Sequence, residues 1–168
     1  MTENRTLVDM TRVRRRPEDA GQEWLRRYVL IGDRNLPTTH QVDDGWILDF
    51  DYQTKPIDPN GSRGNHHAHA RKVRGVRKAA HDAADGIPPL GRFRAQLTWF
   101  VFSNGRRDPI NLSPTIKAMV DGLIDAGLAL DDTANYVDTP TARIVRVDPK
   151  LNARQWMELE ITRWAGLQ

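Results

Sequence analysis

Two short acidic segments of the chain carry residue types that can act on a phosphate. In the first segment, Asp108 directly follows Arg106 and Arg107. The second segment is the pair Asp131 and Asp132. Carboxylate oxygens bind hard divalent cations such as Mg2+, which keeps several waters and needs few protein ligands. Aspartates are also common in surface turns and at helix starts, so the neighbouring residues decide between chemistry and structure.

The neighbours of both segments are cationic. Arg106, Arg107 and Lys117 would share a phosphodiester with a metal ion held by the carboxylates. The ion makes water a better nucleophile, and a lysine beside it stabilises the charge that develops on the phosphate. The arrangement predicts metal-assisted hydrolysis of a phosphodiester. The ordinary alternative for Lys117 is an exposed ion pair with Asp121, four residues further along a helix.

The elements that must position these residues follow from the periodicity of apolar side chains. Alternation of apolar and polar residues predicts four strands, over residues 46–52, 92–102, 141–147 and 155–162. A helical period predicts two main helices, over residues 65–85 and 111–127. The fold class is therefore α+β, with a mixed β-sheet. No glycine-rich loop follows a strand, so a Rossmann or P-loop interpretation has no support.

The second of these helices has the clearest boundaries. Ser113 is expected to cap its start, with Pro114 where a missing N–H costs nothing, and Gly127 is expected just past its end. Both acidic segments flank this helix. Its packing therefore decides whether they meet.

The motifs resemble those of the RusA family of Holliday-junction resolvases. The matching segments are R-R-D-P-I-N-L (106–112), I-K-A-M-V-D-G-L (116–123) and D-A-G-L-A-L-D-D (125–132). They correspond to the family pattern R-D-x-D-N-L, K-A-x-x-D-x-L and A-G-x-x-x-D-D. The loop 56–63, with Asn60 and Arg63, resembles the family's P-x-x-N region. The resemblance covers residues 46–162.

The resemblance implies a homodimeric endonuclease of RusA-like fold that cuts four-way DNA junctions with Mg2+, or with Mn2+ in its place. Asp108 and Asp132 would be catalytic and hold the metal, with Asp131 as a further candidate ligand. Lys117 would be the third catalytic residue and act at the phosphate. Asn111 and Arg107 would support the site or the DNA backbone.

One departure from the family pattern concerns the metal. The pattern places a second aspartate at the position of Ile110, and residues 113–115 are extra. Asp121 or Asp131 could take over as a ligand, or the Asn111 carbonyl or water could suffice. The chain could instead bind junctions without cutting them. We favour a working nuclease, because every other motif position is kept.

The distribution of charge predicts a polyanion partner. The net charge is only +3. Residues 54–94 nevertheless hold nine basic and three acidic side chains, which favours contact with DNA phosphates. The DNA-binding candidates are Arg63, Arg71, Lys72, Arg74, Lys78, Arg106, Arg107 and Asn111. A solvated helix surface is the alternative for the basic helix residues.

The rest of the chain sets the context. Its 168 residues contain no cysteine and no apolar run long enough to cross a membrane, so disulfides, thiol chemistry and a membrane partner are not expected. We predict a cytoplasmic protein of a bacterial host cell, with a phage gene as a possible origin. Residues 1–45 are predicted to be an extension with a basic segment, a short helix over about 17–32 and a linker. Residues 46–168 would form the endonuclease domain.

Two other functions remain open from the sequence. One is a non-catalytic protein that binds branched DNA and has lost a metal ligand at Ile110. The other is a metal-dependent phosphoesterase for a small substrate. Tight binding to a four-way junction would exclude the small-substrate phosphoesterase. Binding of a divalent metal would distinguish the nuclease from the non-catalytic DNA-binding protein.

Overall fold

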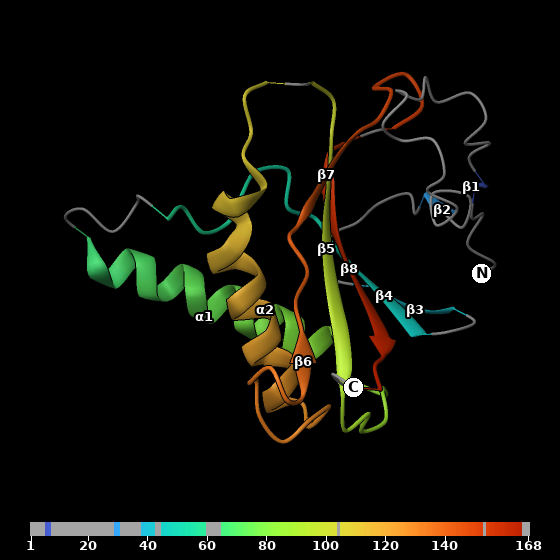
Figure 1. The fold of residues 1–168 in the computed structure, drawn as a ribbon. Coiled ribbons are helices and arrows are strands. Elements are labelled where there is room, and N and C mark those ends of the chain that lie inside the picture. The colour runs from blue at the N-terminus through green and yellow to red at the C-terminus, as the bar shows by residue number, and fades with distance from the viewer. Residues whose placement is uncertain are drawn as a thin grey trace.

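The structure is a computed structural model that describes residues 6–7, 29–30, 38–42, 45–59, 65–103, 105–152 and 154–165. Its main part is an α+β domain with a six-stranded mixed sheet and two helices on one face of that sheet (Figure 1). The predicted fold class is confirmed. Among the described residues, no helix is long and apolar enough to cross a membrane.

The sheet has the strand order β3-β4-β8-β5-β6, and β7 pairs separately with β5. Its strands are β3 (Thr38–Val42), β4 (Gly45–Phe50), β5 (Phe93–Val101), β6 (Val137–Asp138), β7 (Arg143–Arg146) and β8 (Trp156–Arg163). The pairs β3–β4, β4–β8 and β5–β8 are antiparallel. β5 pairs with β6 and β7 in parallel, so the sheet is mixed.

The strand register puts an apolar row under the helices. Leu48 lies opposite Leu159, and Leu159 lies opposite Leu97 on the next strand. All three are fully buried. The apolar residues of β8 thus face the core as the alternation predicts.

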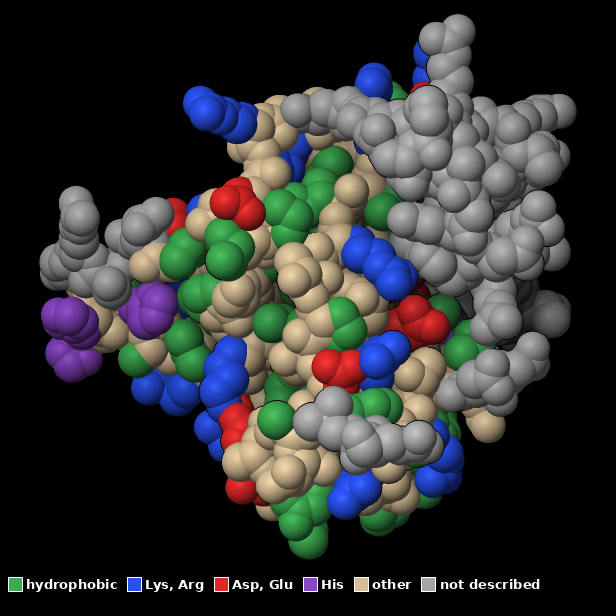
Figure 2. All heavy atoms as spheres, in the orientation of Figure 1, with side chains coloured by type: hydrophobic (Ala, Val, Ile, Leu, Met, Phe, Trp, Pro, Cys, Tyr) green, Lys and Arg blue, Asp and Glu red, His purple; other side chains and the backbone are tan. Residues whose placement is uncertain are grey.

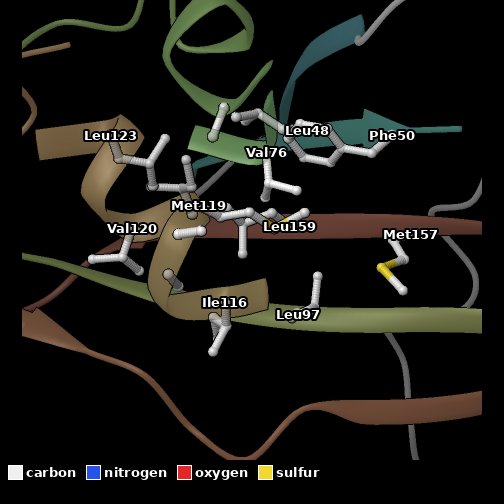
Figure 3. Packing of buried hydrophobic residues seen from close by; sticks show 14 of the residues in the cluster. Leu48, Phe50, Val76, Leu97, Ile116, Met119, Val120, Leu123, Met157 and Leu159 are labelled. Carbon is white, nitrogen blue, oxygen red and sulfur yellow. The ribbon is translucent and has the colours of Figure 1, made fainter. Parts of the chain in front are cut away.

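Two helices cover this row, α1 (His66–Ala83) and α2 (Ser113–Asp125). Figure 3 shows Ile116, Met119 and Val120 of α2 beside Val76 of α1 and the sheet residues, and all belong to one buried cluster. The opposite side of α2 is exposed to solvent and carries Lys117.

The crossing of the two helices is close. A Cβ atom on Gly122 of α2 would lie 2.2 Å from the carbonyl oxygen of Arg77 on α1. The helices are further joined by Arg77, whose Nε and NH2 donate to Asp125 at 2.5 and 2.7 Å. These contacts with α1 fix the position of α2, and with it the position of Lys117.

Both main helices and the four predicted strands are present, and the six-stranded sheet contains two additional strands, β3 and β6. β3 lies in the segment interpreted as a linker, and β6 has only two residues. β3 has the sequence T-T-H-Q-V, which lacks an apolar alternation because it is an edge strand. Its pairing with β4 comes from backbone hydrogen bonds, which periodicity does not report. The division at residue 45 stays a prediction.

The N-terminal segment forms a separate antiparallel pair, β1 (Thr6–Leu7) with β2 (Val29–Leu30). The short helix predicted over 17–32 is therefore wrong at its end, where Val29 and Leu30 form a strand. The rest of that helix and the basic segment before it lie outside the described residues.

The start of α2 differs from the prediction. A 3-10 helix, η4 (Pro109–Leu112), precedes it, and Ser113 is already the first residue of α2. The capping side chain is Asp108, whose Oδ1 accepts a hydrogen bond from the Ile110 N–H at 3.0 Å. Ser113 instead donates from its Oγ to the Ile110 carbonyl at 2.7 Å. The predicted Ser113 cap is wrong because the turn before α2 is formed by residues 109–112, so that Ser113 already lies inside the helix.

The end of α2 is as predicted. Gly127 has φ +85°, a conformation that glycine adopts without strain. Its N–H bonds the Ile124 carbonyl at 2.9 Å, and the Leu128 N–H bonds the Leu123 carbonyl at 3.2 Å. This Schellman turn reverses the chain, and the residues that follow run back beside α2.

Candidate active site

Lys117 joins the motif of residues 116–123 to the motif of residues 125–132. Its Nζ donates to Oδ2 of Asp132 and, at 2.6 Å, to Oδ1 of Asp121. Five extended residues from Leu128 can span roughly 16 Å, whereas the helix between Leu123 and Lys117 is only about 9 Å long. The chain that returns after Gly127 is thus long enough to bring Asp132 to the first half of α2.

The contact favours the charged forms of Lys117 and Asp132. The hydrogen bonds that Lys117 donates to Asp121 and then to Asp132 raise the pKa of Lys117 above its ordinary value. The hydrogen bond from Lys117 lowers the pKa of Asp132, and one involving Asp131 lowers it further. At neutral pH Lys117 is therefore an ammonium and Asp132 a carboxylate.

Asp131 has a local partner. Its Oδ1 accepts a hydrogen bond from the Asp132 N–H at 2.7 Å, and its side chain is exposed. This bond shapes the turn that presents Asp132 to Lys117. A metal-ligand role for Asp131 stays a prediction.

A hollow of about 350 Å³ lies beside the Lys117–Asp132 contact. It is bounded by η4, by the first half of α2 and by residues 139–142, and we call it the Lys117 hollow. Ile110 lines it and is 66% exposed. Ile110, which stands where the RusA pattern has its second aspartate, therefore lines the same hollow as Lys117 and Asp132. It places an apolar side chain there instead of a carboxylate.

A second hollow of about 290 Å³ lies beyond η4. We call it the Arg106 hollow, and its lining includes Lys55, Trp99, Arg106, Arg107, Asp108 and Asn111. Asp108 and Asp132 therefore line different hollows, with η4 contributing residues to both.

The donor chemistry beside Lys117 fits a small divalent cation. Within the described part of the chain, no three His, Cys, Asp or Glu side chains gather in a way that could hold a metal. Mg2+ needs only one or two carboxylates, however, because waters and substrate phosphates complete its shell. Asp121 and Asp132 already converge on one cation, the Lys117 ammonium. They form the pair that would hold the ion, and the set of Asp108, Asp131 and Asp132 stays a prediction.

The DNA-binding candidates on α1 are exposed. Arg71, Lys72 and Arg74 make no ion pair with the described residues, whereas Lys78 pairs with Asp82. Figure 2 shows Lys and Arg side chains over the outer side of α1, with Asp and Glu among them. Arg63 lies outside the described residues. The helix offers positive charge to solvent, and its contact with DNA stays a prediction.

The two DNA-binding candidates that precede Asp108, Arg106 and Arg107, differ in how firmly the fold holds their side chains. Arg106 is exposed and makes no ion pair within the described ranges. Arg107 is half-buried, with its guanidinium 5.2 Å from the ring centre of Trp99 and its NH1 2.5 Å from the Ser103 carbonyl oxygen. Asn111 lines the Arg106 hollow with them. Arg107 is fixed by the fold, and Arg106 is available to a ligand.

The sequence interpretation missed two residues of the Arg106 hollow, Lys55 and Trp99. Trp99 of β5 belongs to the core, with only 7% of the residue exposed, and it also lines this hollow. Lys55 stands in a turn-rich loop far away in sequence. Only the cluster of cations around residues 54–94 hinted that this loop could meet a ligand.

The fold and the site together define an α+β protein with two hollows on either side of η4, one centred on Lys117 and Asp132 and one rich in arginine. No model of a known protein family matches the chain. No curated protein matches it either. The RusA assignment therefore rests on the motif resemblance and is argued below as a proposal.

Proposed function

We propose that this chain is a structure-selective endonuclease of RusA type, which hydrolyses phosphodiesters at four-way DNA junctions with Mg2+ or Mn2+. The observation that carries the proposal is the contact of Lys117 with Asp132. It joins two residues that stand fifteen positions apart, one in each of two motifs, at the rim of a hollow open to solvent.

In this proposal each residue of the group has a distinct role. Asp132 and Asp121 would hold the metal, which when bound would supply activation of water and offset the charge of the phosphate. Lys117 would donate to a phosphate oxygen and stabilise the charge that builds up there. Asp108 acts as a positioning residue, because its bond to the Ile110 N–H holds the turn between the hollows.

The exposed cations would bind the DNA backbone. The positive charge comes from Arg71, Lys72, Arg74 and Arg106, which would contact phosphates and not base edges. The affinity for DNA should therefore depend on the shape of the junction and fall steeply with salt. A four-way junction has two-fold character. We therefore propose a homodimer, acting in the cytoplasm of a bacterial host.

The test is incubation of the purified protein with a labelled four-way junction and with a linear duplex, each with Mg2+ and with EDTA. Symmetric nicks in the junction alone, and only with Mg2+, would support the proposal. Asp132→Asn should lose the nicks, and Asp85→Asn, at an exposed aspartate after α1, should keep them. Absence of both binding and cutting would overturn the proposal.

A second candidate function is junction binding without cleavage. It is favoured by Ile110, which puts an apolar side chain beside Lys117 and Asp132, and by Asp108, which lines the other hollow. A salt-sensitive gel shift without nicks, in Mg2+ and in Mn2+, would establish it. Hydrolysis of a small phosphodiester without junction binding would point to the third alternative, a small-substrate phosphoesterase.

A further inference from the structure

The Arg106 hollow is positively charged. Lys55, Arg106 and Arg107 line it against a single carboxylate, that of Asp108. Asp108 is engaged through Oδ1 by the Ile110 N–H, and Arg106 makes no ion pair among the residues described. Lys55 has a long contact of 3.3 Å with Asp58. Cations from two distant loops thus border one hollow, which favours an anionic ligand.

The wall of the same hollow includes Trp99, whose indole N–H is a buried donor without an acceptor. Trp99 is 7% exposed, and its Nε1 is fully buried with no hydrogen-bond partner. Buried polar groups are almost always hydrogen-bonded, and an exception calls for an explanation. An indole N–H can only donate. An acceptor oxygen of a ligand would supply the missing partner once the side chains that cover Nε1 shift aside.

The walls around this donor are held before any ligand arrives. Arg107 lies over the Trp99 ring and donates to the Ser103 carbonyl. The Asn111 N–H bonds the Asp108 carbonyl at 3.0 Å. Because these walls are already ordered, a ligand in the hollow pays less for ordering them.

We infer that the Arg106 hollow is a phosphate subsite, separate from Lys117 and Asp132, that binds a nucleotide phosphate through Arg106, Lys55 and the Trp99 indole N–H. Its volume of about 290 Å³ is roughly ten times the 30 Å³ of one water, so sugar atoms fit with the phosphate. The phosphate comes from a DNA strand that passes η4. That source rests on the proposed function, whereas the subsite itself does not.

The first experiment reads the indole N–H of Trp99 directly. In the ¹⁵N-labelled protein the five tryptophans give separate indole signals, and Trp99→Phe identifies the one of interest. The protein is titrated without metal with inorganic phosphate, thymidine 5′-monophosphate and a short single-stranded oligonucleotide. We expect a downfield shift of the Trp99 signal that saturates with the oligonucleotide and is weaker with the two small ligands.

Each other outcome counts against part of the inference. A shift with the monophosphate but not with the oligonucleotide would overturn the DNA strand as the source. A Trp99 signal that none of the three moves would overturn the subsite. A saturating shift in a protein that never nicks a junction would keep the subsite and remove the nuclease proposal, so the two can fail separately.

The second experiment uses exposed positions, where folding is not at risk. Arg106→Gln should weaken oligonucleotide binding about fivefold and lower the salt slope by about 0.7, the share of one phosphate contact in a single strand. The matched control is Arg163→Gln. Arg163 is exposed and lies opposite Phe93, six residues or roughly 20 Å along β5 from Trp99. Equal effects of the two variants would contradict the subsite.

Discussion

Lys117 of α2 and Asp132 of the loop after it form an ion pair across fifteen residues of chain. The Schellman turn at Gly127 makes the contact possible, because it turns the chain back along the helix. Asp121 shares the same ammonium from one turn further along α2. The same lysine therefore takes part in the ordinary i,i+4 ion pair and in the proposed catalytic group. Variants are needed to separate its structural role from its catalytic role.

Asp132→Asn should abolish junction cleavage while junction binding stays. The amide keeps the size of the side chain but removes the charge that would hold the metal, so we expect the cleavage rate to fall by roughly 10²-fold or more. Cleavage assays and gel shifts on the same junction measure the two effects. Loss of binding together with cleavage would show that Asp132 is structural.

Ile110→Asp should raise the affinity for the divalent ion. Ile110 lines the Lys117 hollow with Asp132, so a carboxylate there adds an oxygen ligand and a negative charge. We expect metal affinity to rise about tenfold, which corresponds to about 1.4 kcal/mol. Calorimetric titration with Mn2+ measures it, and Ile110→Asn is the matched control of similar shape without charge. An equal gain in both variants would contradict the prediction.

Gly122→Ala should destabilise the fold, whereas Gly75→Ala should stabilise it. A Cβ on Gly122 would lie 2.2 Å from the Arg77 carbonyl oxygen, and such overpacking costs roughly 1–3 kcal/mol. Around Gly75 of α1 nothing lies within 4 Å of the added atom, and alanine there stabilises a helix by about 0.5–1 kcal/mol. Urea unfolding measures both changes. If Gly122→Ala were as stable as the wild type, the close crossing of α1 and α2 would be contradicted.

The pair Arg77–Asp125 should contribute stability that acid removes. The hydrogen bond from Arg77 lowers the pKa of Asp125 below its ordinary value of 3.8. A carboxyl whose pKa is lower in the folded state stabilises the fold above that ordinary value, and the contribution is lost as the pH falls through the folded pKa. Asp125→Asn removes this contribution.

The test of this pair is urea unfolding of wild type and Asp125→Asn at pH 6 and at pH 2.5. The wild type should be modestly more stable at pH 6, since the pair is half-exposed. The difference should shrink at pH 2.5. Asp85→Asn, at an exposed residue, controls for a general effect of net charge. A difference that grows in acid would contradict the assigned sign.

The sequence by itself determined the type and order of most elements. The strand around Leu159 and the helix around Met119 follow from apolar periods of two and 3.6, which are local properties. The end of α2 follows from Gly127, because a positive φ is a property of a single residue. The i,i+4 pair of Lys117 with Asp121 was predictable for the same reason.

Only the tertiary structure decided how these parts meet. The edge strand β3 exists through pairing with β4, and the 3-10 turn η4 replaced the expected Ser113 cap. Above all, the fold put Asp108 and Asp132 in different hollows, and it set Trp99 beside Lys55 from a distant loop. Contacts between distant segments depend on register, helix crossing and turn geometry together. No local pattern of residues contains that information.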